Sequence, residues 1–156
     1  MHLESATLPH LWAHHMAKSS HLTAADYRLR VAEVLAGRVL AAVDATGLPV
    51  ALGGFLVPDN GGPVTCWFSV VRDRGVERRM ARLALLMRSA LRTAAPNFVD
   101  VGLAAYVDDD NPVGRRLAAA LGFSADDLIG FGIRRWLIHG GHADRQAGEK
   151  AIRAGG

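Results

Sequence analysis

Seven arginines crowd one segment of the chain, residues 71–96, where only Asp73 and Glu77 oppose them, so this segment has a net charge of +5. The flanking segments, 1–70 and 97–156, each have a net charge of −1. A local cluster of guanidinium groups attracts phosphate more strongly than the same charge spread over a whole surface. The segment therefore predicts a site for a phosphate-bearing ligand or partner. The alternative is a helix face whose arginines are simply solvated.

A second group of polar residues lies at the end of an apolar run. Tyr106 closes this run, and Asp108, Asp109 and Asp110 follow directly before Asn111. A carboxylate can accept a proton and a phenol can donate one, so Asp108 and Tyr106 are candidates for a general base and a general acid. Acids at this place are also typical of turns and helix caps, and Tyr106 could equally be a core aromatic whose hydroxyl reaches solvent.

Three further residue types could do chemistry but lack the partners that it needs. His10 and His14 have the i, i+4 spacing of a metal pair, yet no third ligand is placed, so exposed helix histidines are expected. Cys66 lies in an apolar run and is predicted to be a small buried hydrophobe. Ser69 has no marked histidine or aspartate beside it, so nucleophilic catalysis is not expected. The sequence predicts no metal site.

The order of apolar patterns predicts the elements that must position these residues. Helical spacing recurs over 8–16, after the N-cap Thr23 and over 76–91, and Asn111 should cap a short helix that begins at Pro112. Strand-like runs cover 39–43, 50–57, 64–71, 98–107 and 133–138, with a further strand suggested near 123–130. The expected order is ααβββαβαβ, an α+β fold with a mixed, mostly antiparallel sheet flanked by helices.

Composition restricts the class of protein. A chain of 156 residues with 50% hydrophobic and 21% charged residues fits one globular domain, and it excludes collagen, a coiled coil and a largely disordered chain. We expect this domain to cover residues 1–139 and residues 140–156 to form a flexible tail. No signal peptide or membrane span is recognised, and the single cysteine cannot form an internal disulfide, so a cytoplasmic location is expected.

The segment Asn111-Pro-Val-Gly-Arg-Arg-Leu-Ala-Ala-Ala-Leu-Gly-Phe123 resembles the signature near the end of GNAT-superfamily N-acetyltransferases. The resemblance covers about residues 8–138. It implies acetyl-CoA as co-substrate, with the pantetheine arm beside a splayed strand and the pyrophosphate at the start of the following helix. Carried over to this chain, the positions that would bind acetyl-CoA are Val70, Val71, Arg72, Arg74, Gly75, Val76, Arg78, Arg79 and Asn111.

Two positions depart from the family pattern. Glu77 stands where the phosphate loop has a small residue, and Ala118 stands where members often have a tyrosine as the acid. Two interpretations therefore stay open. The first is an acetyl-CoA-dependent N-acetyltransferase that acts by direct transfer on an amine, either a small molecule or a protein. The second is a catalytically degenerate GNAT-like structural or binding protein, for example a virion component similar to the acetyltransferase-like proteins of tailed phages. A homodimer or an assembly partner fits both interpretations, whereas a membrane or nucleic-acid partner is not expected.

Overall fold

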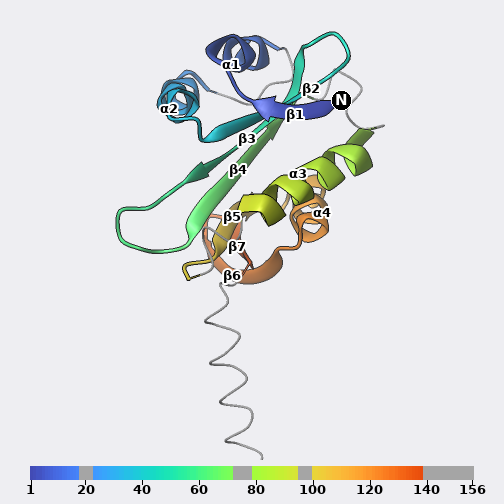
Figure 1. The fold of residues 1–156 in the computed structure, drawn as a ribbon. Helices are drawn as coiled ribbons and strands as arrows, with labels where there is room; N and C mark the ends of the chain where they lie inside the picture. Colours follow the sequence, from blue (N-terminus) through green and yellow to red (C-terminus); the bar gives the residue numbers. More distant parts are fainter. Residues whose placement is uncertain (18–22, 72–78, 95–99, 139–156) are drawn as a thin grey trace, which may run out of the picture. The chain divides into compact units, whose positions relative to one another are not determined.

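The computed structural model describes residues 1–17, 23–71, 79–94 and 100–138 (Figure 1). The chain divides into two compact parts. The N-terminal part comprises residues 1–56 and 66–87, and the C-terminal part comprises residues 57–65 and 88–156. Among the described residues, no helix is long and apolar enough to cross a membrane.

In the N-terminal part, neighbouring strands follow the order β1-β2-β3-β4. These strands are β1 (His2–Ser5), β2 (Val39–Val43), β3 (Pro49–Leu56) and β4 (Val64–Val70). β2 is antiparallel to both β1 and β3. The turn between β2 and β3 is tied by Asp44, whose Oδ1 accepts hydrogen bonds from the backbone N–H of Thr46 at 2.8 Å and of Leu48 at 3.2 Å. These two hydrogen bonds fix an Asx turn, in which an aspartate side chain accepts from backbone N–H groups a few residues on, and the two strands form a hairpin.

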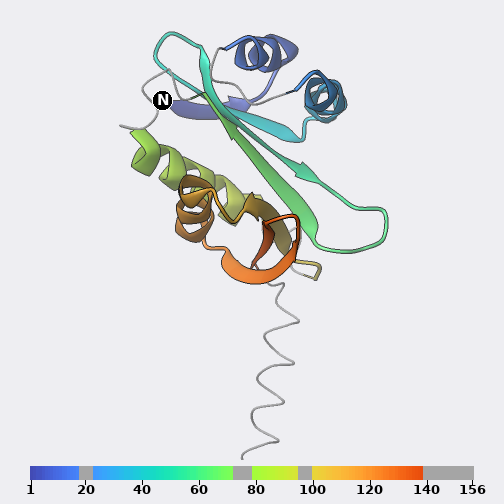
Figure 2. The same cartoon turned by 180° about the vertical axis from the view of Figure 1, so that it is seen from behind.

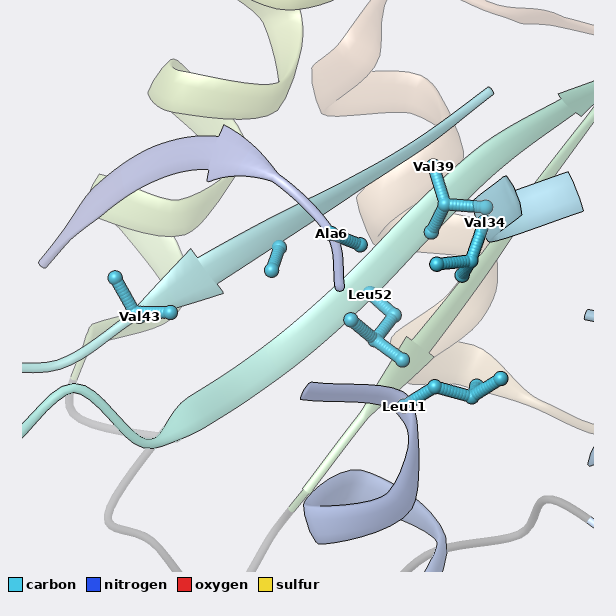
Figure 3. Close-up of a cluster of buried hydrophobic side chains, with 7 residues drawn as sticks. Ala6, Leu11, Val34, Val39, Val43 and Leu52 are labelled. Carbon is cyan, nitrogen blue, oxygen red and sulfur yellow. The ribbon is translucent and has the colours of Figure 1, made fainter. Parts of the chain in front are cut away.

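Two helices, α1 (Leu8–His15) and α2 (Ala24–Leu35), lie together on one side of these strands (Figures 1 and 2). Each begins with a capping box: Thr7 with His10, and Thr23 with Asp26. Their inner faces close over β2 and β3 and form a buried apolar cluster of seven residues (Figure 3). The cluster consists of Ala6, Leu11, Val34, Val39, Ala41, Val43 and Leu52.

α3 (Met80–Ala94) carries the expected apolar stripe, in which Leu83, Met87 and Leu91 are buried. Its predicted first residues, 76–78, lie outside the described residues. In the C-terminal part, neighbouring strands follow the order β5-β7-β6. They are β5 (Leu103–Asp108), β6 (Ser124–Gly130) and β7 (Ile133–Ile138), and both of their pairings are antiparallel.

α4 (Pro112–Leu121) follows β5 and ends at Gly122, whose φ of +99° is the left-handed conformation that stops a helix. The α+β, mostly antiparallel fold class is confirmed. The predicted order omits β1, which precedes the first helix, whereas the further strand suggested near 123–130 is confirmed as β6. β1 is only four residues long and largely exposed, so it shows no alternation. β5 is shorter than predicted because Gly102, at φ +74°, interrupts the apolar run.

Candidate functional site

Most of the predicted phosphate-binding residues lie outside the residues that the structure describes. Five of them stand in the gap that spans residues 72–78: Arg72, Arg74, Gly75, Val76 and Arg78. Arg79 is described and is exposed directly before α3 begins. Its predicted role in binding phosphate stays a prediction.

The last residues of β4 and the residue after it include the two predicted co-substrate contacts Val70 and Val71. Val71 is fully buried, and its backbone N–H donates to the carbonyl oxygen of Val50 on β3 at 2.9 Å. Backbone groups of successive residues in a strand point to alternate sides. The N–H of Val71 is used within the sheet, and in a regular strand the N–H and C=O of Val70 would point to the opposite side, away from β3. Of the two valines that the family resemblance singles out, Val70 is the one that can offer backbone groups to a ligand.

A buried histidine lies against the same strand. His14 is fully buried, and its Nε2 is 3.1 Å from the backbone carbonyl oxygen of Ser69. The prediction of exposed helix histidines is thus wrong for His14, because the inner face of α1 turns this side chain onto β4. The contact uses the backbone of Ser69, so it does not activate the serine hydroxyl. His10 instead belongs to a helix cap, where its Nδ1 accepts from the N–H of Thr7 at 3.3 Å.

Burial also settles the predicted role of the cysteine. Cys66 is 3% exposed, and burial raises the pKa of its thiol to about 12. A thiol that stays protonated at neutral pH is a poor nucleophile and a poor metal ligand. Within the described ranges, no three histidine, cysteine, aspartate or glutamate side chains gather as a metal site would require.

A charged cluster that the sequence does not reveal lies between α2 and β4. Glu33 is 7% exposed; its Oε1 accepts from Arg30 at 2.6 Å, and its Oε2 accepts from the Trp67 indole N–H at 2.7 Å. The Arg30 guanidinium also stacks 4.2 Å from the centre of the Trp67 ring. Hydrogen bonds and a cation–π contact thus hold both charges inside the N-terminal part, and among the described residues Arg30 Nε has no hydrogen-bond partner.

Asn111 caps α4 as predicted. Its side-chain Oδ1 accepts from the backbone N–H of Gly114 at 2.9 Å, and Pro112 follows at the first turn. Gly114 is required here, because a Cβ at this position would lie 2.8 Å from Asn111 Nδ2 and 2.9 Å from Val107 Cγ1. Ala118, the residue at the family's tyrosine position, is 5% exposed and packs inward.

Tyr106 lies on the face of β5 opposite the one that α4 covers. Its neighbour Val107 meets α4 near Gly114, and adjacent strand residues point to opposite faces. Tyr106 is 47% exposed, so the prediction of a core aromatic is replaced by an accessible phenol. Directly across the sheet lies Arg135 on β7.

A β-bulge holds Arg135 in place. Asp126 and Asp127 of β6 together face this single β7 residue, since the register shifts between Ala125 and Leu128. Arg135 Nε donates to Asp126 Oδ2 at 2.6 Å. This hydrogen bond, the Asp126 charge and, less strongly, Tyr106 raise the pKa of the Arg135 guanidinium. Bulges commonly re-aim side chains beside functional sites. Arg135 is thus a cation fixed opposite the Tyr106 phenol, and no pattern in the sequence predicts this placement.

The three aspartates after β5 play separate roles. Asp108 is exposed, and its Oδ1 accepts from the backbone N–H of Asp110 at 3.0 Å. Asp109 makes a two-pronged contact with Arg134, at 2.8 Å to Nε and 3.3 Å to Nη2. These hydrogen bonds, more than the nearby charge, hold the pKa of the Asp109 carboxyl below its usual range. The turn role expected for these acids is confirmed, and Asp108 keeps a second oxygen for a solvent-side partner.

Comparison by sequence finds no match to this chain, whereas comparison by structure finds several similar proteins. No family model matches the chain, and no curated protein matches its sequence. An acetyltransferase of the GNAT family from Bacillus anthracis has a similar structure, with a TM-score of 0.64 and 11% identity over 88% of this chain and 93% of that one.

Two other similar structures are of acetyltransferases that are named for the molecule on which they act. A GNAT-superfamily phosphinothricin acetyltransferase from Sinorhizobium meliloti, in complex with acetyl-CoA, gives a TM-score of 0.60 at 15% identity, covering 90% of both chains. A chimera of spermidine N-acetyltransferase SpeG, from Vibrio cholerae and hSSAT, gives 0.59 at 13% identity, covering 89% of this chain and 96% of that one. Identities this low show the fold alone, and this chain has the GNAT fold.

Proposed function

We propose that this chain is an acetyl-CoA-dependent N-acetyltransferase that transfers the acetyl group directly to an amine. The observation that carries the proposal is the end of β4, where the Val71 N–H donates to Val50 of β3, so that strand alternation turns the backbone groups of Val70 to the other side. A pantetheine arm is an amide chain and can pair with such backbone groups as another strand would. The GNAT fold and the acetyl-CoA in one of its similar structures support this assignment.

The cationic segment supplies the partner for the phosphates. Arg79 stands exposed before α3, and Arg72, Arg74 and Arg78 precede it in the sequence. Guanidinium groups bind phosphate oxygens in a fork, and a helix start adds unpaired N–H groups. Gly75 and Val76 would bring their backbone close to the pyrophosphate. Asn111 Oδ1 accepts the hydrogen bond that caps α4, and its Nδ2 group remains to donate to the co-substrate.

The transfer itself needs three proton movements. The acceptor ammonium must lose a proton before its nitrogen attacks the thioester carbonyl, the nitrogen must lose a second proton as the amide forms, and the departing thiolate must gain one, so that the second nitrogen proton makes good the one that the acid gives to the thiolate. The exposed Asp108 carboxylate is assigned the first step, directly or through a water molecule. Tyr106 is assigned the protonation of the thiolate, with Arg135 as the fixed cation beside it. The acetyl carbon forms its bond to nitrogen as the C–S bond breaks, so no covalent enzyme intermediate is required.

The assay for this proposal follows thiol release from acetyl-CoA with a panel of amines, including amino acids, polyamines and lysine peptides. Tyr106→Phe should lower kcat by about 10²-fold or more, the usual contribution of a general acid. The chain has only two tyrosines, so Tyr27→Phe is the matched control and should retain activity. Equal activity in both variants would remove Tyr106 from the mechanism.

The phosphate-binding arginines are tested by ligand choice. Arg74→Ala, Arg78→Ala and Arg79→Ala should weaken CoA binding while hardly changing the binding of a pantetheine fragment without phosphates. Arg92→Ala removes an exposed arginine near the other end of α3 and is the control. Equal losses for both ligands would show that the arginines only support the loop. Glu77→Gly should strengthen CoA binding, because it removes a like charge.

One observation favours the second candidate, a GNAT-like structural or binding protein without transferase activity. Ala118 is buried at the position from which family members often supply a tyrosine, so α4 offers no acid. Under this reading the chain would bind no acetyl-CoA at millimolar concentration. The cytoplasmic location, or virion association under this second reading, stays a prediction.

A further inference from the structure

The hairpin of β6 and β7 turns at a residue that its turn type disfavours. Gly130 pairs with Ile133 at the end of the hairpin, so Phe131 and Gly132 form a two-residue loop. Their φ angles are +49° and +74°, the pattern of a type I′ turn. Such turns favour asparagine, aspartate or glycine, because other residues are strained at positive φ. Among the described residues, Phe131 is the only one other than glycine with a positive φ.

Packing within the chain does not account for this phenylalanine. The side chain of Phe131 is completely exposed, so burial does not offset the strain of its backbone. A glycine or an asparagine would form the same turn with less strain. Non-glycine residues held in such conformations cluster at functional sites, where the placement of the side chain is part of the function. The position of the turn indicates which function this placement serves.

Hydrogen bonds fasten the hairpin turn to the turn that carries Asp108. The carbonyl oxygen of Gly132 accepts from the backbone N–H of Asp109 at 2.7 Å. The Asp109 carboxylate accepts from the Arg134 guanidinium at 2.8 and 3.3 Å, and Arg134 belongs to β7, which begins directly after the turn. The hairpin turn is therefore held beside the residue proposed as the general base.

The strand register places an apolar side chain on the same face as the proposed acid and base. Asp108 pairs with Ile133, and Tyr106 pairs with Arg135. Paired residues of antiparallel strands share a face, with Cβ atoms about 4.5–5.5 Å apart, and residues two apart in one strand share it as well. Tyr106, Asp108 and Ile133 therefore lie on one face, where Ile133 is 36% exposed. Phe131 stands two residues before Ile133, at the end of this face.

We propose that Phe131 and Ile133 bind the apolar body of the acceptor, and that the acceptor is a primary amine with an aromatic or branched aliphatic substituent and no second charge. This inference rests on the proposed acetyltransferase activity. The ammonium group of such an amine meets the Asp108 carboxylate, while its substituent covers the apolar end of the hairpin. Covering apolar surface on both partners favours binding.

The charges near the turn argue against other common amines. A free amino acid would need a cation for its carboxylate, but both arginines of β7 already hold a carboxylate. Arg134 donates to Asp109, and Arg135 donates to Asp126. A polyamine would need further carboxylates along its length, and residues 128–133 carry no charge. An amine with a single charge and an apolar body therefore suits this surface best.

The test compares 2-phenylethylamine with ethylamine, which have the same reacting group and differ in the apolar body. Acetyl transfer is followed by thiol release from acetyl-CoA, and amine binding without acetyl-CoA is followed by saturation-transfer NMR. We expect a kcat/KM at least about tenfold higher for 2-phenylethylamine, and tighter binding as well. Phe131→Asn should remove most of this preference, and Ile133→Thr should reduce it while keeping a β-branched residue in the strand.

Melting temperatures separate this role from a structural one. Because asparagine suits a positive φ, Phe131→Asn should melt at the wild-type temperature or above it. A preference lost in a fold that is at least as stable cannot come from a damaged hairpin. Leu128→Thr is the matched control, since Leu128 is 54% exposed on the same hairpin but pairs with Arg134 and so lies on the other face. It should leave the preference unchanged.

The outcomes distinguish this inference from the proposed function. Equal kcat/KM for the two amines, or activity confined to polyamines, amino acids or lysine peptides, overturns the inference and leaves the acetyltransferase standing. A preference that both Phe131→Asn and Ile133→Thr leave intact also overturns the inference. A chain that acetylates no amine contradicts the proposed function, and the binding measurement then decides: 2-phenylethylamine that binds no better than ethylamine overturns the inference too.

Discussion

The two parts of the molecule each contain arginine–carboxylate clusters, and they handle charge in opposite ways. In the N-terminal part, Arg30 and Glu33 are largely enclosed, with side chains 14% and 8% exposed, and the Trp67 indole N–H donates to Glu33. In the C-terminal part, Arg134 and Asp109 are 30% and 31% exposed and remain in reach of solvent.

The difference separates a packing device from a site. A buried ion pair has lost its water and depends on its partners, so it fixes how α2 packs on the sheet. A half-exposed ion pair contributes little to stability, but its polar groups stay hydrated and can contact a ligand. The pair of Asp109 and Arg134 lies at the turn that holds Asp108 and Asn111, which follows Tyr106. The residues proposed for proton transfer, Asp108 and Tyr106, belong to this hydrated part.

The largest effect is expected at Glu33, in the cluster of the N-terminal part. Glu33→Leu leaves the Arg30 guanidinium and the Trp67 indole N–H buried without an acceptor, and the free energy of unfolding should fall by about 3–5 kcal/mol. Chemical denaturation measures this loss. The double variant Arg30→Met/Glu33→Leu should recover a large share of it, because the uncompensated charge is gone. A loss below about 1 kcal/mol in the single variant would mean that the cluster behaves like an exposed pair.

Asn111 should show a smaller effect on stability. Asn111→Ala removes the acceptor for the Gly114 N–H and should cost about 0.5–2 kcal/mol in a thermal or chemical melt. Asn111→Asp keeps the cap and places a negative charge at the helix start, so its stability should match wild type. If Asn111 also contacts acetyl-CoA, the Asp variant should bind it clearly more weakly. An Asp variant with unchanged affinity restricts Asn111 to capping.

The smallest effect is expected at Asp109 and depends on pH. Because the pKa of its carboxyl is lowered in the folded chain, the Arg134 contact stabilises the fold at neutral pH. That contribution should disappear as the pH falls through this lowered pKa, below about pH 4. The melting temperatures of wild type and Asp109→Asn should therefore differ slightly at pH 7 and converge in acid. Asp110→Asn removes a carboxylate from the same turn and controls for general charge effects.

Local patterns in the sequence were sufficient where structure is local. The N-caps Thr23 and Asn111 each act within a few residues, and both predictions are confirmed. The apolar stripe of α3 is confirmed for the same reason. Spacing alone does not say which apolar residues are buried, since Leu35 of α2 is 70% exposed.

Contacts between distant residues could not be predicted in this way. The Glu33–Trp67 bond spans 34 positions and the His14–Ser69 bond spans 55, so neither leaves a local pattern. The bulge that places Arg135 between Tyr106 and Asp126 arises from one extra residue in a short strand, which hydrophobic alternation does not resolve. The GNAT likeness rests on one short signature and the element order, which is why the fold was recognisable while family models find no match.

The most direct test of the central claim is calorimetric titration of the wild-type chain with acetyl-CoA. The proposed acetyltransferase predicts one site per chain with a dissociation constant in the micromolar range, about −8 kcal/mol of binding free energy. Binding should weaken when CoA is replaced by a pantetheine fragment without phosphates. The absence of binding heat at millimolar acetyl-CoA, at two temperatures to exclude a zero enthalpy, would contradict the assignment and leave a GNAT-fold protein without its co-substrate.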